Sequence, residues 1–349
     1  MYSENDLQSA VEAGVLSREA ADSLRRHADG LRQTPVADEE HFRLVTGFND
    51  IFVTIAAIIM LFAVGGIGQS IHDVLAGLLV AVTAWGLAEF FTAKKRMALP
   101  SIVLLLAFVG GVLATQATLV EAVIGNDMSE RFGAVIASIV ALITAGAAWV
   151  HWRRFKVPIT IAAGAAAIAG TVGALMIAVL NPPEAQVEET IMALVLIGGV
   201  AIFAFAMHWD ISDRSRETRR SDVAFWLHLL AAPMIAHPLF WLFGVTDGNA
   251  IGAGAAIGVL CVYIAMGLVA IAVDRRALLV SALAYVLGAL TFLFREYGVV
   301  ELNVALTALI IGSALLCLSA FWSTIRHFVV ERLPSNLKSK LPATHLATA

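Results

Sequence analysis

Ten apolar stretches, each about 20 residues long or longer, follow one another through this chain of 349 residues. A helix needs about 20 apolar residues to cross the hydrocarbon core of a bilayer. Backbone groups in lipid must be paired within the segment, and these stretches are too long for the alternating strands of a membrane barrel. We therefore predict an all-α polytopic membrane helix bundle of ten transmembrane helices, at residues 47–68, 74–93, 99–120, 132–151, 157–180, 189–208, 222–243, 250–273, 277–295 and 301–325.

The composition favours the same class of protein. Hydrophobic residues make up 59% and charged residues 14% of the chain, whereas soluble domains contain about 45–50% and about 25%. The lipid bilayer is therefore the expected partner. Cys261 and Cys317 lie in apolar runs, which predicts buried thiols rather than a disulfide. Because no metal-ligand spacing and no phosphate-binding or dinucleotide-binding glycine pattern is present, we expect no metal and no cofactor.

The positions of the basic residues predict the orientation. Lys and Arg gather at alternate turns, so that all of them except Arg131 and Arg295 fall on one face of the ten-helix arrangement. Basic loops stay in the cytoplasm. The first apolar run begins only near Ile51, which is too late for a secretory signal. We therefore predict a bacterial inner-membrane protein with both termini in the cytoplasm, which requires an even number of spans.

Residues 1–34 have the pattern of a small cytoplasmic helical hairpin. Ser3 and Asp6 fit a capping box, Gly14 fits the left-handed position after a helix, and Ser17 can cap a second helix. Residues 35–46 would then be a linker, 47–326 the transmembrane domain and 327–349 a cytoplasmic tail. Duplex binding needs a basic surface, but acids outnumber arginines in the hairpin. The sequence therefore favours a cytoplasmic protein partner over nucleic acid.

Small residues mark where helices can approach closely. Gly254 and Gly258 form a GxxxG step in the eighth span, and paired glycines occur at 65–66, 110–111 and 198–199. Packing within one bundle and a homodimer through the eighth span both fit this pattern. Basic turns also recur between the spans, which either duplication or short loops alone would produce.

The seventh span, 222–243, carries the most unusual residues. His228, Pro233, His237 and Pro238 interrupt an otherwise apolar and aromatic run. The two histidines are about 13.5 Å apart along a helix and point to opposite faces, so they should not share a metal ion. Each proline frees a carbonyl group and should bend the helix. These groups suit either a route for protons or a polar solute, or an internal hydrogen-bond staple.

A few other polar groups lie inside predicted spans, where such groups usually face a cavity or a partner. Asp50 and Glu89 would share a cytoplasmic layer with His228, and Gln116 would lie with His237 nearer the outside. Asp50 and Glu89 could instead snorkel or pair with cations of the inner loops. The loop DISDRSRETRRSD between the sixth and seventh spans is interpreted as a solvated loop, with lipid headgroup contact as the alternative.

The segment AVEAGVLSREAADSL, followed by FRLVTGFNDIFVTIA and many spans, resembles bacterial predicted membrane proteins of unknown function. In those proteins a short cytoplasmic helical segment precedes a multi-span domain. The ten-span count also resembles the drug/metabolite exporter superfamily. The first resemblance implies a layout and no binding site.

No Ser–His–Asp set and no paired carboxylates can be assembled by spacing, so we predict no catalytic residues and no enzyme. The leading hypothesis is a transporter or permease-like protein for a small solute or proton, with its path along the seventh span. The alternative is a non-transporting scaffold or sensor whose N-terminal hairpin binds a cytoplasmic partner.

Overall fold

Helices are the regular elements of the described part of this protein. The computed structural model describes residues 10–11, 13–24, 48–125, 128–214, 216, 218–244, 253–276, 278–279, 283, 286–287, 303–338 and 340–342, and no strand occurs among them. The helices are α3 (Phe48–Ile71), α4 (Asp73–Ala88), the π-helix η1 (Glu89–Lys94), α5 (Ala98–Ile124), α6 (Glu130–Phe155), α7 (Ile159–Leu180), the 3₁₀-helix η2 (Glu184–Gln186), α8 (Val187–Ser212), α9 (Arg219–Trp241), α10 (Ala253–Val273), α12 (Asn303–Ala320), α13 (Trp322–Glu331) and α14 (Ser335–Lys338).

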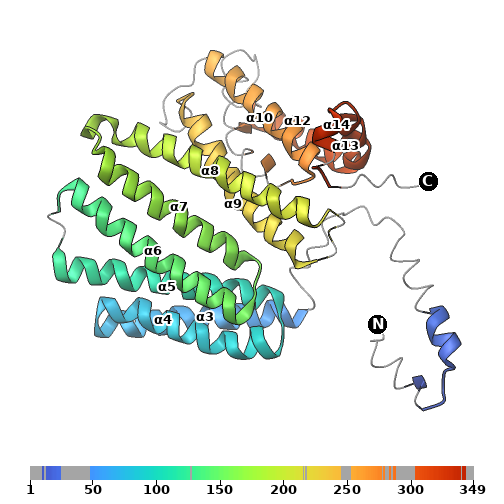
Figure 1. Ribbon diagram of the computed structural model, residues 1–349, viewed down its shortest axis with the longest axis horizontal. Coiled ribbons are helices and arrows are strands. Elements are labelled where there is room, and N and C mark those ends of the chain that lie inside the picture. The colour runs from blue at the N-terminus through green and yellow to red at the C-terminus, as the bar shows by residue number, and fades with distance from the viewer. Residues whose placement is uncertain are drawn as a thin grey trace. The chain divides into compact units, whose positions relative to one another are not determined.

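Eight of these helices, from α3 to α10 with η1 and η2 as extensions, are long and apolar enough to cross a membrane (Figure 1). They correspond to the first eight predicted spans, so the all-α fold and eight of the ten helices are confirmed. This is the architecture of a multi-pass membrane protein. The ninth predicted span, 277–295, lies mostly outside the described residues, of which it contains only 278–279, 283 and 286–287.

The tenth predicted span, 301–325, is not one straight helix. α12 ends at Ala320, and α13 begins at Trp322 after a bend of 74°. The change of direction fits the change in composition, because α13 carries Arg326, His327 and Glu331 where an apolar crossing would need aliphatic side chains. The bent pair counts as one broken span at most, so the tenth span stays a prediction.

α9 is the most enclosed of the eight apolar helices. Half of the residues in its most apolar 18-residue stretch are buried, against 6–33% in the corresponding stretches of the other seven helices. One hydrophobic cluster joins it to α10 and α13, and a second joins it to α7 and α8, with which it lies side by side in Figure 1. α9 stays one helix from Arg219 to Trp241 with both prolines inside it, so a residue on its inner face is surrounded by protein.

The outer surfaces of the helices are apolar. Large hydrophobic side chains such as Phe62, Ile67 and Ile197 are well exposed on the protein surface, as expected where lipid replaces water. Cys261 and Cys317 are free thiols and are exposed. The predicted burial of both cysteines is therefore wrong, because an apolar run in a membrane helix faces lipid as readily as it faces protein.

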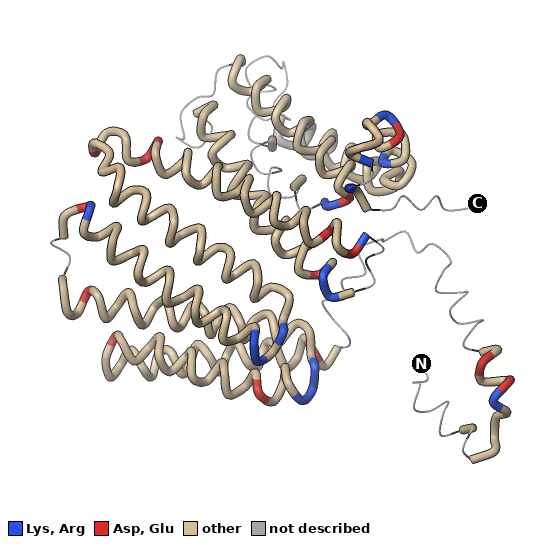
Figure 2. Tube along the Cα trace, in the orientation of Figure 1, with Lys and Arg blue, Asp and Glu red and all other residues tan. Residues whose placement is uncertain are grey.

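Charged residues lie at the ends of the long helices, whose middles are almost free of them in the described part of the chain (Figure 2). At the end of α6, Lys156 takes the left-handed conformation that closes the helix, and Arg96 takes it after η1. Both cations therefore mark a turn between two spans, as the basic loops predicted.

The described residues 10–24 belong to a unit separate from the membrane helices. Gly14 has φ +72°, and the hydroxyl of Ser17 accepts a hydrogen bond of 3.1 Å from the amide of Ala20. The predicted turn at Gly14 and the predicted cap at Ser17 are therefore confirmed. Ser3 and Asp6 lie outside the described residues, so the hairpin as a whole stays a prediction.

Glycines set the closest approaches between helices. A Cβ atom on Gly77 of α4 would lie 2.6 Å from the amide nitrogen of Thr115 in α5, and one on Gly199 would lie 2.9 Å from the backbone of Met234. In the GxxxG step a Cβ on Gly258 would collide with the Phe243 ring, whereas a Cβ on Gly254 would meet nothing within 4 Å. Gly258 therefore serves a packing contact within this chain.

Replacing Gly111 with Ala should lower the free energy of unfolding. The added methyl group would lie 2.7 Å from the carbonyl oxygen of Gly77 and 2.8 Å from the amide nitrogen of Ala81, and such overpacking costs about 1–3 kcal/mol. Gly110→Ala is the matched control, because a Cβ there meets nothing within 4 Å. Thermal unfolding in detergent measures both; equal midpoints would contradict the close α4–α5 contact.

Candidate functional site

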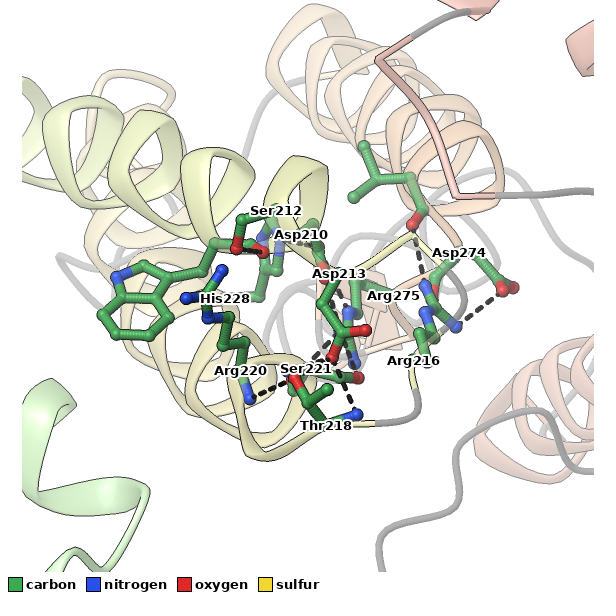
Figure 3. Close-up of polar contacts among 12 residues, drawn as sticks. Asp210, Ser212, Asp213, Arg216, Thr218, Arg220, Ser221, His228, Asp274 and Arg275 are labelled. Carbon is green, nitrogen blue, oxygen red and sulfur yellow. Dashed lines mark hydrogen bonds and ion pairs between the residues drawn. The ribbon is translucent and has the colours of Figure 1, made fainter.

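The most concentrated group of polar side chains inside the described residues is a buried ionic cluster at one end of α8, α9 and α10 (Figure 3). It is drawn from the end of α8, the α8–α9 turn, α9, the segment after α10, and α13. We define this ionic cluster as Asp210, Asp213, Arg216, Ser221, His228, Asp274, Arg275 and Arg326.

Asp210 is the centre of one half of the cluster. It is 1% exposed, and its Oδ1 accepts a hydrogen bond of 2.6 Å from Nη2 of Arg275. Its Oδ2 lies 2.8 Å from Nε2 of His228, a side chain with no exposed surface. Arg275 also donates to the backbone oxygen of Ser221 over 3.2 Å. One carboxylate thereby joins α8, α9 and the segment after α10.

Asp274 is the centre of the other half. Its Oδ2 accepts a hydrogen bond of 2.8 Å from Arg216, and its Oδ1 accepts one of 2.6 Å from the indole of Trp322. Arg326 of α13 lies 3.7 Å from the same Oδ1. Asp274 itself has a positive φ of 61°. This turn therefore places two consecutive charged residues, Asp274 and Arg275, into the two halves of the cluster.

Asp213 fixes the α8–α9 turn. Its Oδ2 accepts hydrogen bonds from the hydroxyl of Thr218 (2.6 Å), from the amide of Thr218 (3.0 Å) and from the amide of Ser221 (3.3 Å). These are amides of the first turn of α9, where a carboxylate satisfies free donors and complements the helix dipole. Asp213 therefore fixes the start of α9 and, with it, the position of His228 along the helix axis.

The charges of the cluster balance. Three carboxylates (Asp210, Asp213 and Asp274) lie with three guanidinium groups (Arg216, Arg275 and Arg326). Burial, and then the nearby charge of Arg275, lowers the pKa of Arg216 from its ordinary value, while Asp274 acts in the opposite direction. An arginine stays charged at neutral pH, so each buried cation needs its carboxylate.

The C-terminal segment closes one side of the cluster. Arg326 donates a hydrogen bond of 2.8 Å to the carbonyl oxygen of Pro342, and Arg214 donates one of 2.9 Å to that of Leu341. The Leu341 side chain packs with Val273 and Val330. Part of the segment predicted as a tail, 327–349, is therefore folded against the membrane helices.

Of the predicted site residues, the structure places only His228 in the cluster. His237 is half-buried and lies nearer the C-terminal end of α9. Glu89 opens the π-helix η1 and forms a two-bond pair with Arg154 of α6, at 2.9 and 2.5 Å. Glu89 is therefore paired with a cation at the end of α6, as one of the two alternatives expected; that this end faces the cytoplasm stays a prediction.

Asp50 and Gln116 lie elsewhere. Asp50 is buried in the first turn of α3, and its backbone oxygen accepts a hydrogen bond from Thr54. Gln116 of α5 donates to the hydroxyl of Thr144 in α6 over 3.1 Å. Glu89 pairs with Arg154 of α6 and His228 with Asp210 of α8, and a shared layer of Asp50, Glu89 and His228 stays a prediction.

Sequence reasoning missed most of the cluster. The sequence predicts a solvated loop between the sixth and seventh spans, but Asp210 and Asp213 in it are buried and the side chain of Arg216 is only 9% exposed, so the prediction is wrong for these three charges. The available signal was the number of acids beside the arginines of this basic turn. Arg275 is predicted only as one of the basic residues of the turn after the eighth span, and Asp274 is not predicted at all.

No group of three or more His, Cys, Asp or Glu side chains that could hold a metal ion occurs among the described residues. Comparison of the chain with protein-family models, with curated proteins and with solved structures finds no match. The chemistry of the cluster therefore carries the functional argument. The cluster holds the buried imidazole of His228 against the carboxylate of Asp210, among equal numbers of carboxylates and guanidinium groups.

Removing one charge of the Asp210–Arg275 pair should destabilise the protein strongly. Asp210→Asn and Arg275→Met each leave a buried charge without its partner, which costs about 3–5 kcal/mol. The double variant removes both charges and should lose less than the sum of the two, with a coupling energy of roughly 0.5–3 kcal/mol.

Chemical or thermal unfolding in detergent measures this cycle. Glu89→Gln is the control, because it breaks a pair whose side chains are 37% and 53% exposed, and surface pairs contribute little. Additive losses in the double variant would show that Asp210 and Arg275 do not depend on each other.

Proposed function

We propose that this protein is a transporter or permease-like protein that moves a proton or a small solute, and that His228 is its proton-binding group. The observation that carries the proposal is the contact between His228 and Asp210 inside an apolar span. Ionisable groups at such positions are costly, and they typically mark ion or substrate pathways.

The imidazole of His228 is held so that one nitrogen stays available. Its Nε2 lies against Asp210, whereas its Nδ1 has no hydrogen-bond partner among the described residues. With the proton on Nε2, the ring donates to the carboxylate and Nδ1 keeps a lone pair. A proton arriving at Nδ1 converts the ring to imidazolium, which the Asp210 carboxylate stabilises, and it leaves from the same nitrogen.

Access to His228 requires movement of its surroundings. The side chain has no exposed surface, and the ring of Phe203 packs edge-on against it, with 5.1 Å between the two ring centres. The Arg216–Asp274 pair ties the α8–α9 turn to the segment after α10. We propose that separation of this pair opens one side of α9, while His237 and the carbonyls freed by Pro233 and Pro238 continue the route.

Proton flux in vesicles tests this proposal. Purified protein is reconstituted with pyranine inside, and a potassium diffusion potential drives protons inward. The unmodified protein should acidify the lumen faster than empty vesicles. His228→Phe with His237→Phe should lower the rate by roughly tenfold or more, as expected when a positioned proton carrier is removed.

His208→Phe is the matched control, because His208 is an exposed histidine near the end of α8. Its flux should equal that of the unmodified protein. Undiminished flux in the double variant, at equal protein content, would contradict the role of the two histidines. No flux above empty vesicles in any form would contradict proton transport itself.

A non-transporting scaffold or sensor is the second candidate. The observation that favours it is the separate unit that contains residues 10–24, where Val15 is exposed. Such a unit could bind a cytoplasmic protein partner. In the flux experiment, deletion of residues 1–34 should leave transport unchanged if the membrane helices act alone.

We propose the finer topology as well: ten crossings in a bacterial inner membrane, with both termini in the cytoplasm. The gathering of Lys and Arg at alternate turns supports it. In a chain with Cys261 and Cys317 changed to Ala, Arg153→Cys should resist a membrane-impermeant maleimide applied to intact cells and react after lysis. Labelling of intact cells would contradict the inward position of this turn.

A further inference from the structure

A groove of about 510 Å³, lined by α6, α7 and α8, differs from the ionic cluster in that its lining is apolar. Its floor consists of small residues, among them Gly164, Ala165 and Ala169 of α7, and Ile197 and Ala201 of α8 form a wall. The volume lies in the range of about 300–1,000 Å³ that is usual for ligand sites.

The groove is open to the surroundings of the protein rather than to its core. α7, which supplies its floor, is the least buried of the eight spans, with 6% of its apolar window enclosed. Ile168, Val172 and Ile197 line the groove and are exposed. In a membrane, such a surface meets lipid chains, which an aliphatic groove of this volume can hold.

One end of the groove carries positive charge. Trp149 and Trp152 line the groove there, and each has a cation over its ring. The guanidinium of Arg153 lies 5.1 Å from the centre of the Trp149 ring, and the ammonium of Lys156 lies 5.1 Å from that of Trp152. Tryptophan and basic residues are typical of the depth at which lipid headgroups lie.

The apolar lining suits a hydrocarbon chain, and the two stacked cations suit a negatively charged headgroup. We propose that the groove binds an anionic phospholipid of the surrounding bilayer, with an acyl chain between α7 and α8 and its phosphate at Arg153 and Lys156. Stacking on tryptophan holds both cations in place before the lipid arrives, which reduces the entropy lost on binding. This proposal does not depend on the transport activity.

Native mass spectrometry of the full chain, released from mixed phosphatidylglycerol and phosphatidylcholine membranes, tests the proposal. The unmodified protein should retain phosphatidylglycerol in preference to phosphatidylcholine. Arg153→Gln with Lys156→Gln should lower this preference by about fivefold for each cation removed. Lys94→Gln with Arg96→Gln is the matched control: it also removes one Lys and one Arg, and Arg96, like Lys156, has a positive φ.

The groove itself is tested by Ala201→Phe, which places a ring in the space for the chain and should abolish retention of either lipid. Ala204→Phe is its control, since Ala204 is also an exposed alanine of α8 and does not line the groove. Equal retention of both lipids by the unmodified protein would overturn the proposal. So would equal losses in the groove variants and their controls, or a dimer of the unmodified protein that Ala201→Phe converts to a monomer without loss of lipid.

Discussion

The carboxylate of Asp210 is the group on which the centre of this protein depends. A buried charge is tolerated only where other charges and donors replace water, and Asp210 meets that condition with Arg275 and His228. Because the three residues come from α8, α9 and the segment after α10, the cost of burying one carboxylate fixes the mutual position of three parts of the chain.

α9 gains its special position from the same constraint. It is enclosed by two hydrophobic clusters, so its polar residues have protein rather than lipid as their surroundings. A histidine there can keep a hydrogen bond to a carboxylate and still present its second nitrogen to an apolar interior. On α7, which faces outward, the side chains are almost all aliphatic. α9 therefore carries polar side chains that are enclosed by protein, whereas α7 carries aliphatic side chains that face outward.

The fold was predictable from the sequence as far as it depends on length and hydropathy. A bilayer imposes one length on every crossing, so α3 to α10 could be located from composition alone. The bend before α13 was not predictable in this way, because Phe321 and Trp322 continue the apolar run, and only the later Arg326 shows that the direction changes. Hydropathy reports what a segment could cross, and it does not report where the chain turns.

The site was predictable only in part, for a different physical reason. His228 was conspicuous because it interrupts an apolar helix. Asp210, Asp274 and Arg275 were hidden in basic turns, where an acid reads as an ordinary loop residue. Whether such a residue faces water or another charge depends on a partner up to 65 positions away. Opposite charges on two different turns gave no periodic signal from which that pairing could be predicted.

The hydrogen bonds from Arg214 and Arg326 to the backbone carbonyls of Leu341 and Pro342 make the last described residues part of the membrane-domain architecture. Backbone acceptors are supplied by any sequence, so this closure depends on the presence of residues 341 and 342 more than on which side chains they carry. A protein shortened before Leu341 would remove one hydrogen-bond acceptor from each of two arginines at once. A fluorescent or affinity label therefore belongs after Pro342 and not in place of it.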